Sequence, residues 1–310
     1  MRILFAGTPQ VAVRTLDALH EAGFEIAAVL TRPDAPLGRK RVMTPSPVAA
    51  RATELGLEVI KSSTIDSAVT AQIAELKVAA AAIVAYGGLV PAVALPVPTH
   101  GWINLHFSLL PAWRGAAPVQ HAIIHGDDIT GAATFQLETG LDTGPVYGQV
   151  TEVIDENTTA GDLLQRLSDS GSQLLVQTLH ALEAGVANPV PQSGNGSYAP
   201  KLTDADARLD FSKPATEIRR RAHGTLPAPG PWAMAGEQRY KFGPLREVRE
   251  RRDLACGELH IEPGKRPIVL IGTATWALEV TALQPPGKKM MNAADWARGA
   301  LANDLKVNFA

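Results

Sequence analysis

The feature that most constrains the fold is a regular alternation of short apolar runs with amphipathic stretches in the first half of the chain. The spacing of apolar residues predicts helices with one buried face at 9–19, 46–56 and 66–76. Between them, apolar runs typical of strands lie at 3–6, 25–31, 57–60, 78–85, 103–106 and 133–137. Such alternation predicts a doubly wound, mostly parallel α/β sheet of the Rossmann-like kind, which binds ligands beyond the carboxyl ends of its strands.

The length of 310 residues indicates two domains. A long amphipathic helix is expected over Thr159–Gly185, and residues 188–200, rich in Pro, Gly, Ser and Asn, resemble a linker. Beyond them, short β-like runs between Gly and Pro turns predict a small, OB-like β-barrel. We therefore expect an α/β domain in residues 1–187, a linker in 188–203 and a basic barrel domain in 204–310.

The net charge of −2 conceals an asymmetry between the two halves. Residues 1–203 carry 12 Lys+Arg and 18 Asp+Glu, a net of −6, whereas residues 204–310 carry 17 and 13, a net of +4. A basic tail domain suggests a polyanionic partner, although a solvated surface explains the charge equally well. A second basic cluster, Arg39-Lys40-Arg41, lies in the otherwise acidic first half.

Several classes of protein are disfavoured by what the sequence lacks. The single Cys256 rules out an intrachain disulfide framework and favours a reducing compartment. Residues 78–98 are uncharged and of membrane-span length, but three prolines there favour a strand, a turn and a short helix instead. There is no Gly-rich dinucleotide or P-loop motif. His121 and His125 are one helical turn apart without an evident third ligand, so we expect no metal site.

Candidate catalytic side chains gather between residues 102 and 145. Alternation along the strand ending at 106 places Asn104 and His106 on one face, where an amide and an imidazole can polarise a carbonyl and stabilise an oxyanion. Asp142 follows in a turn between glycines. The alternative is that Asn and Asp form turns here and His106 is a core histidine. No nucleophile-elbow motif is present.

Two blocks of sequence carry a family resemblance. Asn104-Leu105-His106 with Ser108–Pro111 and Trp113–Pro118, and later Leu141–Gly144, resemble the motifs of folate-dependent formyltransferases. Within that superfamily the chain is most similar to the enzymes that act on methionyl-tRNA. The features that point there are the basic loop 32–47, the Ala85-Tyr86-Gly87 segment and the ending 284–289, so that the resemblance runs along nearly the whole chain.

This resemblance implies a catalytic α/β domain with Asn104, His106 and Asp142 as its catalytic trio. The donor would be 10-formyltetrahydrofolate, and the acceptor would be the α-amine of methionine on initiator tRNA. The amine would attack the formyl carbon, Asn104 and His106 would stabilise the oxyanion, and Asp142 would orient His106 and help to move protons. Neither a metal nor a covalent enzyme intermediate is required.

The resemblance also implies two binding regions. The folate region would be formed by Tyr86, Gly87, Leu89, Val90, Ser108, Leu109, Leu110 and Pro111, although Leu89 and Val90 also suit plain core packing. The tRNA region would be formed by Arg39, Lys40, Arg41, Arg220, Lys288 and Lys289, with the C-terminal cations contacting phosphates. We expect a monomeric, cytoplasmic protein that does not contact a membrane.

Three other functions share some of these features. A formyltransferase acting on a small amine, such as an amino-sugar nucleotide or glycinamide ribonucleotide, would use the same trio but has no need of the basic loop and tail. A hydrolase would pass the formyl group of the folate to water. An RNA-binding protein on the same scaffold would have no use for the intact trio. The basic regions together with the trio favour tRNA formylation.

Overall fold

The computed structural model describes residues 1–38, 40–302 and 307–309, and the chain divides into two compact units. The first unit comprises Met1–Pro118, Ile129–Glu152 and Leu164–Ala199, and the remaining residues form the second. Of the expected linker, 188–203, residues 188–199 belong to the first unit and 200–203 to the second. The division into a catalytic domain at 1–187, a linker and a tRNA-binding domain at 204–310 stays a prediction.

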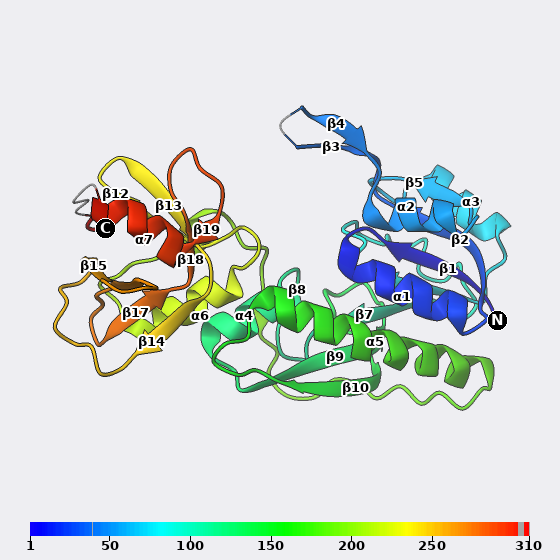
Figure 1. Cartoon of the computed structure of the whole chain (residues 1–310). Helices are drawn as coiled ribbons and strands as arrows, with labels where there is room; N and C mark the ends of the chain where they lie inside the picture. The colour runs from blue at the N-terminus through cyan, green and yellow to red at the C-terminus, as the bar shows by residue number, and fades with distance from the viewer. Residues whose placement is uncertain (39, 303–306, 310) are drawn as a thin grey trace. The chain divides into compact units, whose positions relative to one another are not determined.

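The first unit is built on a seven-stranded sheet with the strand order β10-β9-β7-β6-β1-β2-β5 (Figure 1). Strand β1 pairs in parallel with β2 and β6, β2 with β5, and β6 with β7, whereas β7 and β9 are antiparallel. The mostly parallel α/β sheet predicted from the sequence is confirmed. The strands are β1 (Arg2–Gly7), β2 (Glu25–Thr31), β5 (Val59–Lys61), β6 (Ala80–Val84), β7 (Trp102–His106), β9 (Ile129–Gln136) and β10 (Val146–Val153).

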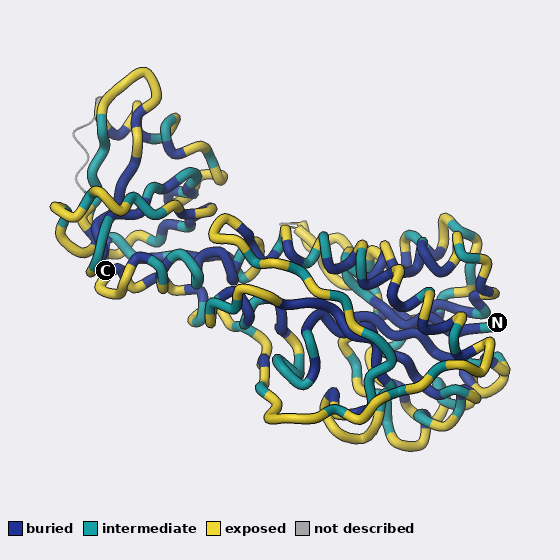
Figure 2. Tube along the Cα trace, turned by 90° about the horizontal axis from the view of Figure 1, so that it is seen from below, coloured by how far each residue is buried: buried dark blue, intermediate teal, exposed yellow. Residues whose placement is uncertain are grey.

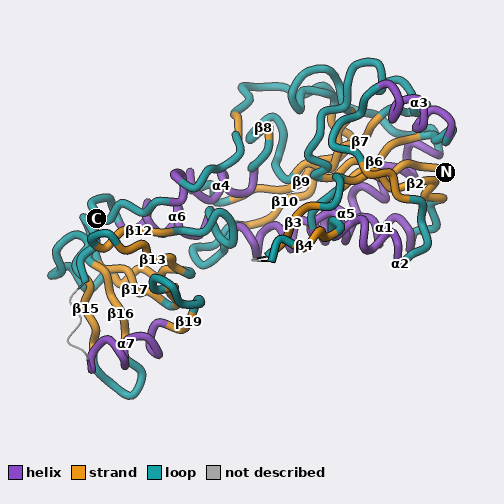
Figure 3. Tube along the Cα trace, turned by 90° about the horizontal axis from the view of Figure 1, so that it is seen from above, coloured by secondary structure: helices purple, strands orange, loops and turns teal. Residues whose placement is uncertain are grey.

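Helices cover both faces of this sheet, as Figure 3 shows. On one face, α1 and α5 are joined where Ser168 Oγ donates a hydrogen bond to the Val11 carbonyl. On the other face, Ile73 of α3 packs in a cluster with Leu4 and Trp102. The central strands are therefore buried on both sides (Figure 2), which explains their unbroken apolar runs. The helices are α1 (Gln10–Glu21), α2 (Pro47–Glu54), α3 (Ser67–Glu75) and α5 (Ala160–Glu183).

Residues 32–44, predicted as a loop, contain a β-hairpin that extends away from the sheet (Figure 1). It pairs β3 (Ala35–Leu37) with β4 (Val42–Thr44) in antiparallel register. The side chains of Leu37, Val42 and Met43 are each more than half exposed. The loop prediction was wrong because neither face of this hairpin is buried, so its sequence shows no alternation of apolar and polar residues.

The second unit contains two antiparallel four-stranded sheets, in the orders β12-β13-β18-β19 and β14-β17-β16-β15. The antiparallel β-domain is confirmed, but the pairings among the described residues leave two sheets rather than one closed barrel. The strands are β12 (Trp232–Ala235), β13 (Gln238–Phe242), β14 (Leu245–Val248), β15 (Leu259–Glu262), β16 (Ile268–Ile271), β17 (Ala277–Val280), β18 (Ala282–Gln284) and β19 (Met291–Asn292). The helical segments are α4 (Pro118–His125), α6 (Ala215–Gly224), α7 (Ala293–Ala302) and a 3₁₀ turn (Ala205–Ala207).

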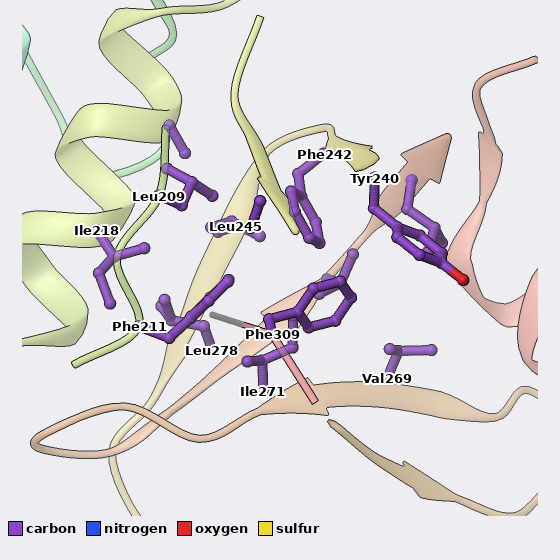
Figure 4. Close-up of a cluster of buried hydrophobic side chains, with 14 of the residues drawn as sticks. Leu209, Phe211, Ile218, Tyr240, Phe242, Leu245, Val269, Ile271, Leu278 and Phe309 are labelled. Atoms are coloured by element: carbon purple, nitrogen blue, oxygen red, sulfur yellow. The ribbon is translucent and has the colours of Figure 1, made fainter. Parts of the chain in front are cut away.

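An aromatic cluster holds the second unit together (Figure 4). The ring of Phe309 lies 5.8 Å from Phe211, 5.4 Å from Tyr240 and 5.3 Å from Phe242, measured between centroids. Ile218 of α6 and strand residues from both sheets complete the cluster, so the two sheets share one core. In the described part of the chain, no helix is long and apolar enough to cross a membrane.

Candidate active site

Asn104 and His106 lie at the carboxyl end of β7, on the same face of the strand, as their spacing predicted. His106 is only 6% exposed, whereas Asn104 is half-buried. Within the described residues, the carboxamide of Asn104 makes no hydrogen bond to the protein. A half-buried amide at a strand end that is left without a protein partner is available to a ligand.

The hydrogen bonds of His106 define which of its ring nitrogens carries the proton. Nε2 lies 2.9 Å from the carbonyl oxygen of Trp113, and because a carbonyl can only accept, Nε2 is the donor. Nδ1 lies 3.8 Å from Oδ2 of Asp142. Burial lowers the pKa of His106, while the carboxylate of Asp142 and the bond to Trp113 oppose that change. The resting ring is therefore neutral, with the lone pair of Nδ1 on the side of Asp142.

Asp142 is held in the turn by its backbone and by its side chain. Its φ of +52° is in the left-handed region, which non-glycine residues seldom adopt. Oδ2 accepts a 2.7 Å hydrogen bond from the backbone N–H of Gly115, and the side chain is almost fully buried. Gly144 is required nearby because a Cβ there would lie 1.8 Å from the carbonyl oxygen of Gln136. The turn thus fixes one carboxylate oxygen toward His106.

Two residues of this site were missed by sequence reasoning. Gln192 donates hydrogen bonds to the backbone carbonyls of Asp142 and Gly144, and Ser197 accepts one from the backbone N–H of Trp113. Both lie in the segment that composition assigned to a linker. No local pattern signals them, because their partners are about 50 to 84 residues away along the chain.

Ser108 was predicted to lie in the folate region, and neither a nucleophile nor a metal site was expected here. Ser108 is fully buried, and its hydroxyl donates a 2.6 Å hydrogen bond to the carbonyl of Ala112, so that it closes a turn. Across the ranges that the structure describes, no group of three or more His, Cys, Asp and Glu side chains is arranged to hold a metal ion. What the site offers is an amide that can donate a hydrogen bond, Asn104, and an imidazole facing a carboxylate, His106 and Asp142, a pair that is chemically able to exchange a proton.

The first stretch of the predicted folate region follows β6. Tyr86 is buried, its hydroxyl donates to the Ser62 carbonyl, and burial raises its pKa. Gly87 adopts φ +82° and its carbonyl accepts a hydrogen bond from Arg32. Val90 packs partly into the neighbouring core, whereas Leu89 is 86% exposed. Leu89 is therefore the side chain of this stretch that is open to solvent.

The second stretch of the predicted folate region follows β7. Leu110 is buried against Phe135, while Leu109 and Pro111 are half-buried. Leu110 and Pro111 also line an open pocket of about 320 Å³, whose other walls are residues 146–149 and 190–193. Because β6 and β7 are adjacent and parallel, the two stretches leave the sheet at the same edge.

The cations predicted to bind tRNA lie in both units. Arg39 lies outside the described residues, whereas Lys40 and Arg41 are exposed at the tip of the β3–β4 hairpin. In the second unit, Lys288 and Lys289 are exposed in the turn between β18 and β19. Arg220 differs from them, because it lines a small pocket together with Asp127, Asp128 and Asp155, and its guanidinium packs on Gly126.

Comparison with known proteins gives matches along the whole chain. The sequence matches the families described as "Formyl transferase" over residues 1–179 and "Formyl transferase, C-terminal domain" over residues 201–301. It is 60% identical over 309 residues to a protein of Paenarthrobacter aurescens named methionyl-tRNA formyltransferase, covering all of both chains. A protein of Thermobifida fusca with the same name is 52% identical and is covered to 98%.

Solved structures share the fold at much lower identity. The sugar 3N-formyl transferase WlaRD, crystallised in the presence of dTDP and 5-N-formyl-THF, matches with a TM-score of 0.68 and 17% identity, over 93% of this chain and 99% of that one. HypX of Aquifex aeolicus in complex with tetrahydrofolic acid matches with a TM-score of 0.70 and 16% identity, over 98% of this chain and 48% of that one.

Proposed function

The chain belongs to the methionyl-tRNA formyltransferase family, and we propose that Asn104, His106 and Asp142 carry out its reaction. The enzyme transfers the formyl group of a formyl-tetrahydrofolate to the α-amino group of methionyl initiator tRNA. We take the donor to be 10-formyltetrahydrofolate. The observation that carries the assignment of roles is the free carboxamide of Asn104 beside the buried His106–Asp142 pair.

Asn104 is suited to stabilise the negative charge that develops on the oxygen of the formyl group. When the amine attacks the formyl carbon, the carbonyl oxygen gains negative charge, and a fixed N–H donor stabilises that charge. The Asn104 amide can make this hydrogen bond without breaking one to the protein. Its position on a strand of the central sheet also keeps it from moving away as the charge develops.

His106 and Asp142 are suited to accept the proton of the attacking amine and to pass it on. In the neutral ring, the unprotonated Nδ1 lies 3.8 Å from a carboxylate oxygen of Asp142. Both atoms are hydrogen-bond acceptors, so a proton placed between them is attracted by both. As the bond between the amine nitrogen and the formyl carbon forms, the amine proton passes to this pair. Once protonated, Nδ1 donates to the oxyanion or returns the proton to the folate nitrogen as its bond to the formyl carbon breaks.

Folate binding is proposed at the loops that follow β6 and β7. Both lie at the sheet edge that carries Asn104 and His106, where open α/β sheets bind ligands. Leu89 is exposed and Val90, Leu109 and Pro111 are half-buried, so apolar side chains are accessible there to contact a flat pteridine ring. Tyr86, Ser108 and Leu110 are buried and contribute by shaping the loops.

Binding of tRNA is proposed at exposed cations that lack a protein carboxylate. Lys40 and Arg41 at the hairpin tip, and Lys288 and Lys289 in the second unit, form no ion pair within the described residues. Contacts of this kind provide salt-dependent affinity for phosphates. Arg220 is expected to contribute less, since carboxylates line the same pocket.

The test is formyl transfer to methionyl initiator tRNA, run beside methionyl elongator tRNA and a reaction without RNA. Formylmethionine formed only with the initiator is the expected result. Asn104→Ala should lower kcat by about 10²–10³-fold with little change in the melting temperature, because one oxyanion donor is lost and no hydrogen bond to the described residues is broken. The matched control is the exposed Asn188→Ala. Deformylation of the folate without RNA, or transfer only to small amines, would overturn the proposal.

A further inference from the structure

Gln192 forms a bridge between the two loops that carry the catalytic site. Its Nε2 donates to the backbone carbonyls of Asp142 (2.8 Å) and Gly144 (2.9 Å). Its Oε1 accepts from Nε (3.1 Å) and Nη2 (2.6 Å) of Arg114. One carboxamide therefore uses both of its N–H groups and both acceptor positions of its oxygen.

Only glutamine meets the requirements of this position. One side presents two carbonyl oxygens, which need two donors, and the other presents a guanidinium, which needs an acceptor. Glutamate at 192 would keep the acceptor for Arg114 but would place a negative charge against the two carbonyls. Methionine would keep the length and lose every hydrogen bond.

Gln192 belongs to a longer positioning strap, which we define as residues 190–199. At its start, Val190 and Val146 exchange two 2.8 Å backbone hydrogen bonds. At its end, β11 (Tyr198–Ala199) pairs in parallel with β8 (Arg114–Gly115). Between them, Ser197 Oγ accepts a 2.8 Å hydrogen bond from the backbone N–H of Trp113.

The strap contacts two residues whose backbone conformation is unusual. Trp113 (φ +58°) and Asp142 (φ +52°) are both non-glycine residues in the left-handed region. Such conformations persist only when the surroundings define them. Trp113 supplies the carbonyl that fixes the tautomer of His106, and Asp142 supplies the facing carboxylate. Through these two residues the strap acts on both members of the proton-exchanging pair.

We propose that Gln192 is a positioning residue for formyl transfer, which sets the Asp142 carboxylate relative to the His106 ring. This inference rests on the proposed roles of Asp142 and His106. Gln192 itself touches no reacting atom. Its loss should therefore slow the chemical step and leave substrate binding in place, because a misplacement of about 1 Å is enough to lower a rate by about 10²-fold.

The experiment compares Gln192→Glu, Gln192→Met and the control Gln165→Met, which changes an exposed glutamine of α5 in the same unit. For each protein, the melting temperature, kcat, and KM for folate and for tRNA are measured. Both Gln192 variants should lower kcat by about 10²-fold with KM within about twofold, and the control should match the wild type. If Gln192→Met does not fold, Gln192→Glu, which keeps a polar side chain of the same length, gives the answer. Full activity of Gln192→Glu would overturn the proposal, because the two donated hydrogen bonds would then be dispensable.

A double variant separates positioning from general weakening of the structure. If Gln192 acts through Asp142, adding Gln192→Met to Asp142→Asn should cause little further loss of kcat. Losses that multiply would overturn the inference, since Gln192 would then act elsewhere. Wild-type kcat in Asp142→Asn alone would instead overturn the proposed role of Asp142. The failure of the inference and the failure of the proposed function are thus distinguishable.

Discussion

The stability of the second unit should depend on pH through His223. This side chain of α6 is 1% exposed, and its Nε2 lies 3.0 Å from the Leu245 carbonyl oxygen. Burial, and next the charge of Arg219, lower its pKa from 6.5 to about 4. The folded state therefore disfavours the charged ring, and stability falls as the pH drops from about 6.5 toward 4, where the unfolded chain binds a proton and the folded one does not.

The magnitude follows from the difference between the two pKa values. A pKa lowered by about 2.5 corresponds to about 3–4 kcal/mol at about 1.4 kcal/mol for each pH unit. Most of this loss, about 2 kcal/mol, should already be present at pH 5, whereas the loss at pH 7.5 should be close to zero. The penalty applies in the folded state because the ring is buried and its Nε2 is held at β14 by the contact with the Leu245 carbonyl.

The assay is urea unfolding at pH 7.5 and at pH 5, followed by tryptophan fluorescence, to which Trp232, Trp276 and Trp296 of the second unit contribute. The quantity of interest is the change in unfolding free energy between the two pH values, compared between the wild type and His223→Gln. His223→Gln should show a change smaller by about 2 kcal/mol, whatever its stability at pH 7.5. The matched control is the less buried His260→Gln, which should behave as the wild type. An equal pH dependence in the wild type and His223→Gln would refute the reasoning.

Three further predictions concern binding, the catalytic turn and stability. Changing Lys40 and Arg41 to Ala should raise KM for tRNA, and the slope of log affinity against log salt concentration should fall by the amount expected for about two lost phosphate contacts. The affinity for folate, measured by fluorescence titration, should be unchanged. Gly144→Ala should lower kcat by about 10²-fold, since its Cβ would lie 1.8 Å from a carbonyl oxygen and displace the turn. Glu247→Leu should lower the unfolding free energy by about 3 kcal/mol in chemical denaturation, because the side chain of Arg219, only 11% exposed, would lose its carboxylate at 2.9 Å.

The fold of the first unit was predictable because its signals are local. A parallel sheet covered by helices on both faces needs strands that are apolar throughout, and the runs at 3–6 and 103–106 lie within β1 and β7. The period of two along a strand also placed Asn104 and His106 on one face. The hairpin at 35–44 gave no such signal, because exposure on both faces leaves its residue pattern unconstrained.

The proposed catalytic residues and the residues that position them differ in how far their sequence signals extend along the chain. Asn104, His106 and Asp142 stand in compact motifs that sequence reasoning could find, but the conformation of Asp142 depends on Gly115, 27 residues away, and on Gln192, 50 residues away. Composition assigned residues 188–200 to a linker because Pro, Gly, Ser and Asn favour turns whether or not those turns are held in place. Hydrogen bonds to loops that are distant along the chain hold this segment in place, and such contacts leave no periodic pattern in the sequence. It follows that substitutions in the strap should lower the rate of formyl transfer while every residue of the recognisable motifs is intact.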